Sequence, residues 1–173
     1  VPVCIAGNIP DIHELRDPNT AVLLDSAQAM PTEFPSWCDA MCLSFFPTKL
    51  ITTGEGGAII TNDANLVSWA VRQRSLGVTS HNPHPWNRSC KQAGYNFRMA
   101  EAQAALGISQ LRRLPEFLAK RHELASHYND RFRGTDVVPV HDGSCQYQMY
   151  IVLVHSSKRD AAVYAMRDQG IEV

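Results

Sequence analysis

The sequence predicts an α/β protein, because short apolar segments alternate with longer amphipathic ones. Three apolar segments, at residues 21–25, 41–46 and 57–61, have the length of β-strands. Their nearly continuous apolar character is typical of strands that are buried on both faces of a sheet. A turn that contains glycine joins the second segment to the third, so we expect these two to form a hairpin.

Helical segments follow these strands. The first begins at Asn62 or Asp63, either of which can cap a helix, and it ends before Gly77. A helix rich in small residues is expected next, and Pro115 then marks the first turn of a longer one. The remaining expected elements are helices at 99–111, 115–132 and 158–170 and a strand at 145–154.

Composition and charge disfavour several classes of protein. With 45% hydrophobic and 19% charged residues, the chain has the profile of a globular protein with a core. Its formal net charge is -1 and its basic residues are dispersed, so nothing favours binding to nucleic acid or to a membrane surface. No apolar segment approaches the roughly 20 residues of a membrane span. Residues 1–10 show no signal-peptide pattern.

The five cysteines have irregular spacing. Cys38 and Cys42 form a CxxxC pair, but no second Cys or His pair stands at the spacing of a zinc site. We therefore expect small buried thiols in a reducing cytoplasm, with a metal site as the less favoured alternative. His81 and His84 belong to a segment rich in Pro, Asn and Ser, 78–98, for which we expect a polar surface loop.

Polar residues stand where the apolar segments end. Asp25 closes the first strand, Gln28 follows three residues later, Ser44 lies in the second strand, and Lys49 lies just beyond it. In an open α/β sheet, ligands bind outside the carboxyl ends of the strands, so Asp25 faces a ligand-binding edge. Each residue also has an ordinary alternative: an acid in a turn, a packed hydroxyl or a solvated lysine. Their joint occurrence favours a site.

The glycines that follow Lys49 predict a tight turn. Gly54, Gly56 and Gly57 permit positive φ and let the chain fold back into the strand at 57–61. Because the lysine precedes the glycines and no GxxxxGK[ST] pattern is present, this segment does not match a phosphate-binding loop of the Walker type.

Three longer motifs resemble the DegT/DnrJ family of sugar aminotransferases, which use pyridoxal phosphate (PLP). They are "LLDSAQAMPTEF", "SFFPTKLITTGEGGAIIT" and "AGYNFRMAEAQAALGISQLRRL", in this order along the chain. A weaker match at 6–15, "AGNIPDIHEL", corresponds to the helix that precedes the Asp25 strand in that family. The resemblance implies the central-to-C-terminal part of a fold-type-I PLP-dependent transferase, with a mostly parallel sheet and flanking helices. Residues 1–112 would form the second half of the large PLP-binding domain, and 113–173 a linking helix and the start of the small α+β domain.

The resemblance also implies a role for each candidate residue. Lys49 would be the Schiff-base lysine and later the proton shuttle, and Asp25 would pair with the protonated pyridinium nitrogen of PLP. Gln28 would lie near the 3-oxygen of the ring, and Ser44 would bind the phosphate. Asn96 would reach the phosphate of the neighbouring subunit, since the family builds two shared sites across a homodimer.

The activity implied by the resemblance is the transfer of an amino group from glutamate or glutamine to a keto sugar, which we expect to be nucleotide-linked. A dehydratase on the same scaffold is one alternative, but such relatives carry histidine where this chain has Lys49. Another alternative is a non-catalytic remnant or partner subunit, because family members are about twice as long. Relatives often carry histidine at the position of Gln148, so the resemblance assigns no substrate role there.

Overall fold

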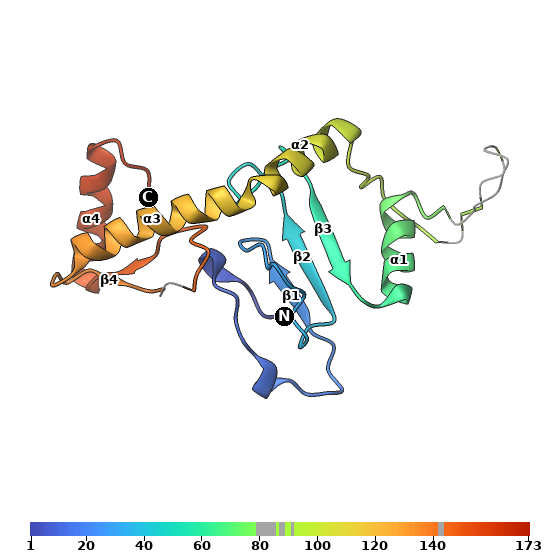
Figure 1. Cartoon of the computed structure of the whole chain (residues 1–173), viewed down its shortest axis with the longest axis horizontal. Helices are drawn as coiled ribbons and strands as arrows, with labels where there is room; N and C mark the ends of the chain where they lie inside the picture. Colours follow the sequence, from blue (N-terminus) through green and yellow to red (C-terminus); the bar gives the residue numbers. More distant parts are fainter. Residues whose placement is uncertain (79–85, 87–88, 91, 142–143) are drawn as a thin grey trace.

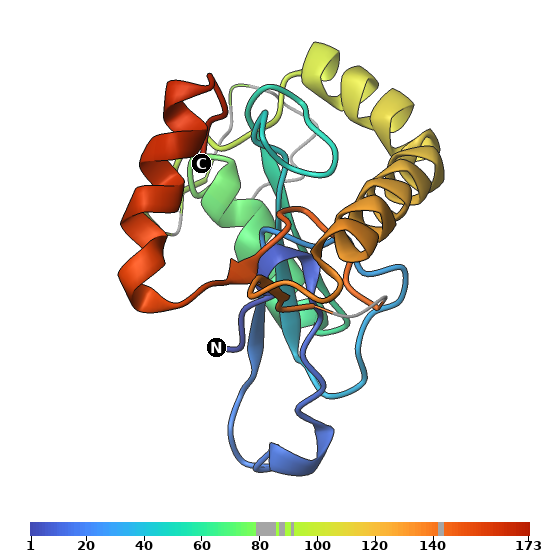
Figure 2. The same ribbon diagram turned by 90° about the vertical axis from the view of Figure 1, so that its left-hand side faces the viewer.

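The structure is a computed structural model in which a three-stranded sheet and a small second unit are joined by a long helical arm (Figures 1 and 2). The expected loop residues His81 and His84 lie outside the described part of the chain. The described residues are 1–78, 86, 89–90, 92–141 and 144–173.

The sheet contains the three predicted strands in the order β1 (Leu23–Ser26), β2 (Ala40–Ser44) and β3 (Gly57–Thr61). Strands β1 and β2 are parallel, whereas β2 and β3 are antiparallel, so the expected hairpin is confirmed. The side chains of Leu24 and Met41 are almost fully buried at the centre of this sheet. Parallel and antiparallel pairing therefore meet at β2, the middle strand, so the sheet in the described part of the chain is mixed and not mostly parallel as the resemblance implied.

The turn between β2 and β3 uses its glycines in two ways. Gly54 and Gly56 have positive φ values of 79° and 146°, as predicted. Residues other than glycine rarely adopt such a backbone conformation. Gly57 does not have positive φ, so that part of the prediction is wrong. A Cβ atom at Gly57 would lie 2.6 Å from the carbonyl oxygen of Leu43, so close strand pairing is what excludes a side chain there.

Helix α1 (Ala64–Arg74) begins at the residue that the sequence offered as a cap. The Asp63 carboxylate accepts the backbone N–H of Asn65 at 2.8 Å, which satisfies a donor that the first helical turn leaves unpaired. Gly77 follows the helix with φ of 74°, as expected for its C-terminal end. No residue of α1 is buried, although the helix packs beside β3.

The helical arm consists of α2 (Glu101–Arg112) and α3 (Leu114–Phe132), which follow each other directly (Figure 1). Pro115 occupies the first turn of α3, where its missing N–H has no intrahelical partner in any case. Helix α3 leads from the sheet to α4 (Ser156–Asp168) at the other end of the molecule. Within the described part of the chain, no helix has the length and apolar character needed to cross a membrane.

The predicted strand at 145–154 is wrong in its length. Only Val152–Leu153 (β5) is a strand, and it pairs antiparallel with β4 (Val138–Pro139), which the sequence did not predict. Residues 145–149 instead cross the first residues of the chain, and their backbone groups are hydrogen-bonded there. Where apolar side chains at 145–149 are buried, the reason is therefore that this segment packs against the start of the chain, and not that it is a strand of a sheet.

The helix that the resemblance implied at 6–15 does not form. The segment contains two short 3-10 turns instead, η1 (Ile5–Gly7) and η2 (His13–Leu15). Ala6 has left-handed φ of 57°, and Pro10 lacks the N–H that a helix interior requires. The first residues are therefore held by contacts with other segments and not by their own helical hydrogen bonds.

Large apolar side chains remain exposed on both faces of the edge strand β3 and on α1. Ile59 and Ile60 point to opposite faces of the sheet and are 52% and 38% exposed, and Trp69 is 47% exposed. Such a surface costs solvation free energy and leaves an unpaired strand edge. We therefore expect residues 1–173 by themselves to be poorly stable and to need another chain or further sequence to complete the fold.

Thermal unfolding of the purified 173-residue polypeptide, followed by circular dichroism and combined with light scattering, measures this stability. The expected result is a broad transition at low temperature, or association into larger species. A sharp and reversible transition of a monomer would contradict the prediction.

Candidate active site

Four of the five candidate residues gather at one edge of the sheet. Because β1 and β2 are parallel, their carboxyl ends lie side by side, with Asp25 aligned to Cys42. Gln28 follows the end of β1, Ser44 is the last residue of β2, and Lys49 lies in the turn beyond it. The structure thus brings a carboxylate, an amide, a hydroxyl and an amine to the same edge.

Asp25 is half-buried and its carboxylate is oriented by the backbone. Its Oδ1 atom accepts the N–H of Ala27 at 3.0 Å. Burial raises the pKa of the Cys42 thiol, and the negative charge of Asp25 raises it further. Burial likewise raises the pKa of the Cys4 thiol, and the negative charge of Asp25 also acts to raise it. The carboxylate is therefore flanked by neutral thiols, and its charge is available to a cationic partner.

Gln28 holds the start of the chain against this edge. Its Oε1 atom accepts the backbone N–H of Ala6 at 2.7 Å, which fixes the orientation of the amide because an N–H needs an acceptor. The remaining end of the side chain is the NH₂ group, a donor. Gln28 therefore presents donor hydrogens to any acceptor that binds at the edge.

Ser44 and Lys49 belong to a segment that is fixed at both ends. The Ser44 hydroxyl accepts the N–H of Phe46 at 3.4 Å, and the N–H of Lys49 donates to the carbonyl of Phe46 at 3.0 Å. Leu50 and Ile51, which follow Lys49, are buried in an apolar cluster. Lys49 itself is half-buried, and its side chain leaves the backbone from a hydrogen-bonded turn.

Asn96 is the candidate that the structure does not place with the other four. It is exposed, it pairs with Ser75 at the end of α1, and its Oδ1 atom accepts Nε of Arg98 at 3.0 Å. The rings on either side of it, Tyr95 and Phe97, stack with centroids 4.8 Å apart and are also largely exposed. This segment presents polar and aromatic groups away from the chain's own core.

Residues 145–149 pack against the start of the chain, a contact that the sequence did not predict. Their backbone crosses η1 closely: the N–H of Gln146 donates to Gly7, and the N–H of Gln148 donates to Ala6, at 3.0 and 2.8 Å. A Cβ atom at Gly7 would lie 3.0 Å from the nitrogen of Tyr147, so only glycine fits the crossing without displacement. No local pattern predicts such a contact, because the two segments are about 140 residues apart.

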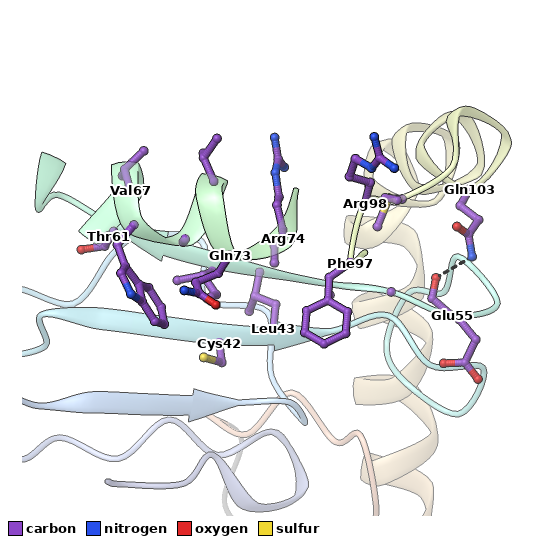
Figure 3. A pocket seen from close by; sticks show the side chains of 18 residues that line it. Cys42, Leu43, Glu55, Thr61, Val67, Gln73, Arg74, Phe97, Arg98 and Gln103 are labelled. Carbon is purple, nitrogen blue, oxygen red and sulfur yellow. Dashed lines mark hydrogen bonds between the residues drawn. The ribbon is translucent and has the colours of Figure 1, made fainter. Parts of the chain in front are cut away.

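A separate groove of about 780 Å³ lies between α1, β3 and the segment that leads into α2 (Figure 3). Arg74, Phe97 and Arg98 line it, and at one end Gln103 Nε2 donates to the carbonyl oxygen of Glu55 at 3.1 Å. None of the five candidate residues lines this groove. It is therefore distinct from the edge that carries Asp25 and Lys49.

Known proteins resemble this chain in both sequence and fold. The sequence profile of the DegT/DnrJ/EryC1/StrS aminotransferase family matches residues 1–173. A UDP-4-amino-4,6-dideoxy-N-acetyl-beta-L-altrosamine transaminase of Campylobacter jejuni subsp. jejuni serotype O:23/36 is 33% identical over an alignment of 139 residues, with 75% of this chain and 36% of that protein covered. GDP-perosamine synthase of Caulobacter vibrioides is 32% identical over 189 residues, with 99% of this chain and 50% of that protein covered.

Among solved structures, Helicobacter pylori PseC, an aminotransferase involved in the biosynthesis of pseudoaminic acid, superposes with a TM-score of 0.88 at 28% identity. The match covers 97% of this chain and 49% of PseC, so the chain spans about half the length of the relatives that it matches. The fold is that of the central-to-C-terminal part of a fold-type-I transferase, as predicted. The chain belongs to the DegT/DnrJ/EryC1/StrS aminotransferase family.

Proposed function

We propose that the protein is a PLP-dependent aminotransferase that moves an amino group from glutamate or glutamine to a keto sugar, and that this sugar is nucleotide-linked. The observation that carries the proposal is that Asp25, near the end of β1, and Lys49, in the turn after the adjacent parallel strand β2, belong to the same edge of the sheet. Family membership supports the reaction class, and the names of the two relatives refer to a UDP-linked and a GDP-linked amino sugar.

The residues at this edge fit the chemical groups of PLP. Lys49 supplies the amine that holds the cofactor and then carries a proton between atoms of the substrate. Asp25 supplies the negative charge that keeps a ring nitrogen protonated, and the NH₂ group of Gln28 donates to an oxygen on the ring. Ser44 supplies a hydroxyl for the phosphate. When bound, PLP supplies the electron sink that amino transfer requires.

Asn96 fits a role across a subunit interface. Its exposure, together with that of Tyr95 and Phe97, leaves this segment available to a second copy of the chain. We propose a homodimer in which Asn96 completes the phosphate site of the partner. Free thiols at Cys38 and Cys42 are compatible with the reducing cytoplasm that we propose as its location.

We place a domain boundary after residue 112. Residues 1–112 then form the second half of the large PLP-binding domain, and residues 113–173 form the linking helix and the beginning of the small domain. The separate sheets of the two parts, β1–β3 and β4–β5, support this division.

An amino-transfer assay tests the proposal. The intact protein is supplied with PLP, a nucleotide-linked 4-keto sugar and either glutamate or glutamine, and the product is identified by mass spectrometry. We expect an amino sugar whose formation depends on the amino acid. A keto-deoxy sugar formed without an amino donor would instead identify a dehydratase.

The exposed apolar surface of β3 and α1 favours one further possibility, a non-catalytic partner of a longer relative. In that case the protein by itself would bind no PLP, and mixing it with such a relative would restore binding. Retention of Lys49 and Asp25 together makes the enzyme the better supported of the two.

A further inference from the structure

The peptide unit immediately before Lys49 is held at both of its ends. Its N–H, which belongs to Lys49, donates to the carbonyl of Phe46 at 3.0 Å and closes a four-residue turn with Pro47 at the second position. Its carbonyl, which belongs to Thr48, accepts Nε2 of Gln148 at 3.0 Å. The orientation of this peptide unit determines the direction in which the Lys49 side chain leaves the backbone.

Gln148 is itself anchored, so it can serve as a fixed reference point. Its N–H donates to the carbonyl of Ala6 at 2.8 Å. Nη1 of Arg121, on α3, donates to the carbonyls of Tyr147 and Gln148 at 2.8 and 3.1 Å. Hydrogen bonds from a charged guanidinium are stronger than neutral ones, so both peptide groups around Gln148 are firmly held. The crossing of the 145–149 segment with η1 is visible in both views (Figures 1 and 2).

The side chain of Gln148 is not explained by stability alone. Its Oε1 atom is buried and has no hydrogen-bond partner among the described residues. A buried acceptor without a donor destabilises the folded state, so an apolar side chain of similar length would be the better choice for packing. What the side-chain amide does provide is the hydrogen bond from its Nε2 atom to the carbonyl of Thr48.

We propose that Gln148 is a positioning residue that orients Lys49 through the Thr48 carbonyl. The functional meaning of this contact rests on the proposed role of Lys49, but the contact itself concerns only the polypeptide. Through this hydrogen bond, the 145–149 segment sets the direction in which the Lys49 side chain leaves the backbone at the sheet edge. Leu50 and Ile51 hold the other side of Lys49 by burial, so loss of the Gln148 contact frees one side only.

Hydrogen exchange at the Lys49 amide tests the proposal in the intact protein without cofactor. The variant Gln148→Met keeps the length and volume of the side chain but cannot donate to Thr48. We expect the Lys49 amide to exchange about five- to tenfold faster, the change that corresponds to one ordinary hydrogen bond. Amides of β2, such as that of Leu43, should exchange at the unchanged rate, which distinguishes a local effect from global destabilisation.

Gln146→Met is the matched control. Gln146 lies two residues earlier, and its side chain makes two hydrogen bonds to the backbone of Met30, at 2.7 and 2.9 Å. Neither of these bonds involves a residue of the Lys49 turn. This variant should lose more thermal stability than Gln148→Met and leave exchange at Lys49 unchanged. If Gln148→Met fails to fold, Gln148→Asn replaces it, because that amide is one methylene too short to reach Thr48.

Equal exchange at Lys49 in the wild type and Gln148→Met, or the same increase in both glutamine variants, would overturn the proposal. With PLP added, Gln148→Met should also attach the cofactor to Lys49 about fivefold more slowly than the wild type or Gln146→Met, measured by borohydride trapping over time. If PLP does not attach even to the wild type, the proposed function fails, whereas the exchange result still decides whether Gln148 orders the turn.

Discussion

Replacement of Lys49 by alanine is expected to abolish covalent attachment of PLP and to lower amino transfer by at least about 10³-fold. An amine that loses and regains a proton is required at this position, and proton transfer by one positioned group alone contributes about 10²–10⁴-fold to a rate. The measurement is the intact mass after borohydride reduction. The wild type should gain the mass of one reduced cofactor, whereas Lys49→Ala should gain none.

Lys120→Ala is the matched control for this prediction. Lys120 lies on α3, its side chain is largely exposed, and its ammonium pairs with Glu123 at 2.8 Å, at a surface where such pairs contribute little to stability. Its removal should leave cofactor attachment and activity unchanged. If Lys49→Ala retained both the absorbance of lysine-bound PLP and amino transfer, the assignment of Lys49 would be wrong.

Asp25→Asn is expected to lower amino transfer by about 10²-fold or more while the protein stays folded. Asparagine keeps the Oδ1 atom that accepts the N–H of Ala27, so the local backbone is preserved. What disappears is the negative charge, and the loss of one preorganised electrostatic group at a reacting site costs about this factor. Steady-state rates at saturating PLP measure the effect, with thermal unfolding as the check on folding.

A second readout shows whether the substitution changed the charge as intended. Because the Asp25 carboxylate raises the pKa of Cys42 in addition to burial, Asp25→Asn should move that pKa downward, toward its ordinary value. The pH dependence of Cys42 alkylation measures this shift. Asp63→Asn is the control, since asparagine also caps α1 and no change in activity is expected. Full activity of Asp25→Asn would remove Asp25 from the proposed site.

The sequence by itself determined the elements whose signals are local. The cap at Asp63, the glycine after α1 and the proline in the first turn of α3 act on their immediate neighbours, and the structure has the corresponding helix ends. Apolar segments of strand length predicted the hairpin of β2 and β3. The ends of β1 and β2 are local features as well, and from them the sequence predicted polar residues, Asp25 among them, at a ligand-binding edge of the sheet.

The motifs around Lys49 carried the family assignment for a similar reason. Residues 44–61 combine a buried strand, a turn and glycines whose backbone conformations are specified by their own residue types. Such a segment specifies its structure within about 20 residues. The resemblance could therefore be recognised from this segment and two others without reference to how the ends of the chain pack.

Only the tertiary structure decided how the first and last parts of the chain meet. The helix expected at 6–15 is replaced by 3-10 turns because the backbone of Ala6 bonds to Gln28 and to Gln148 instead of to its own helix. The first half of the strand expected at 145–154 forms the other side of this crossing. Partners that lie 22 and about 140 residues away leave no trace in a local hydrophobic pattern. The contact between Gln148 and the turn of Lys49 belongs to the same class, since backbone groups take whichever partner the folded chain brings to them.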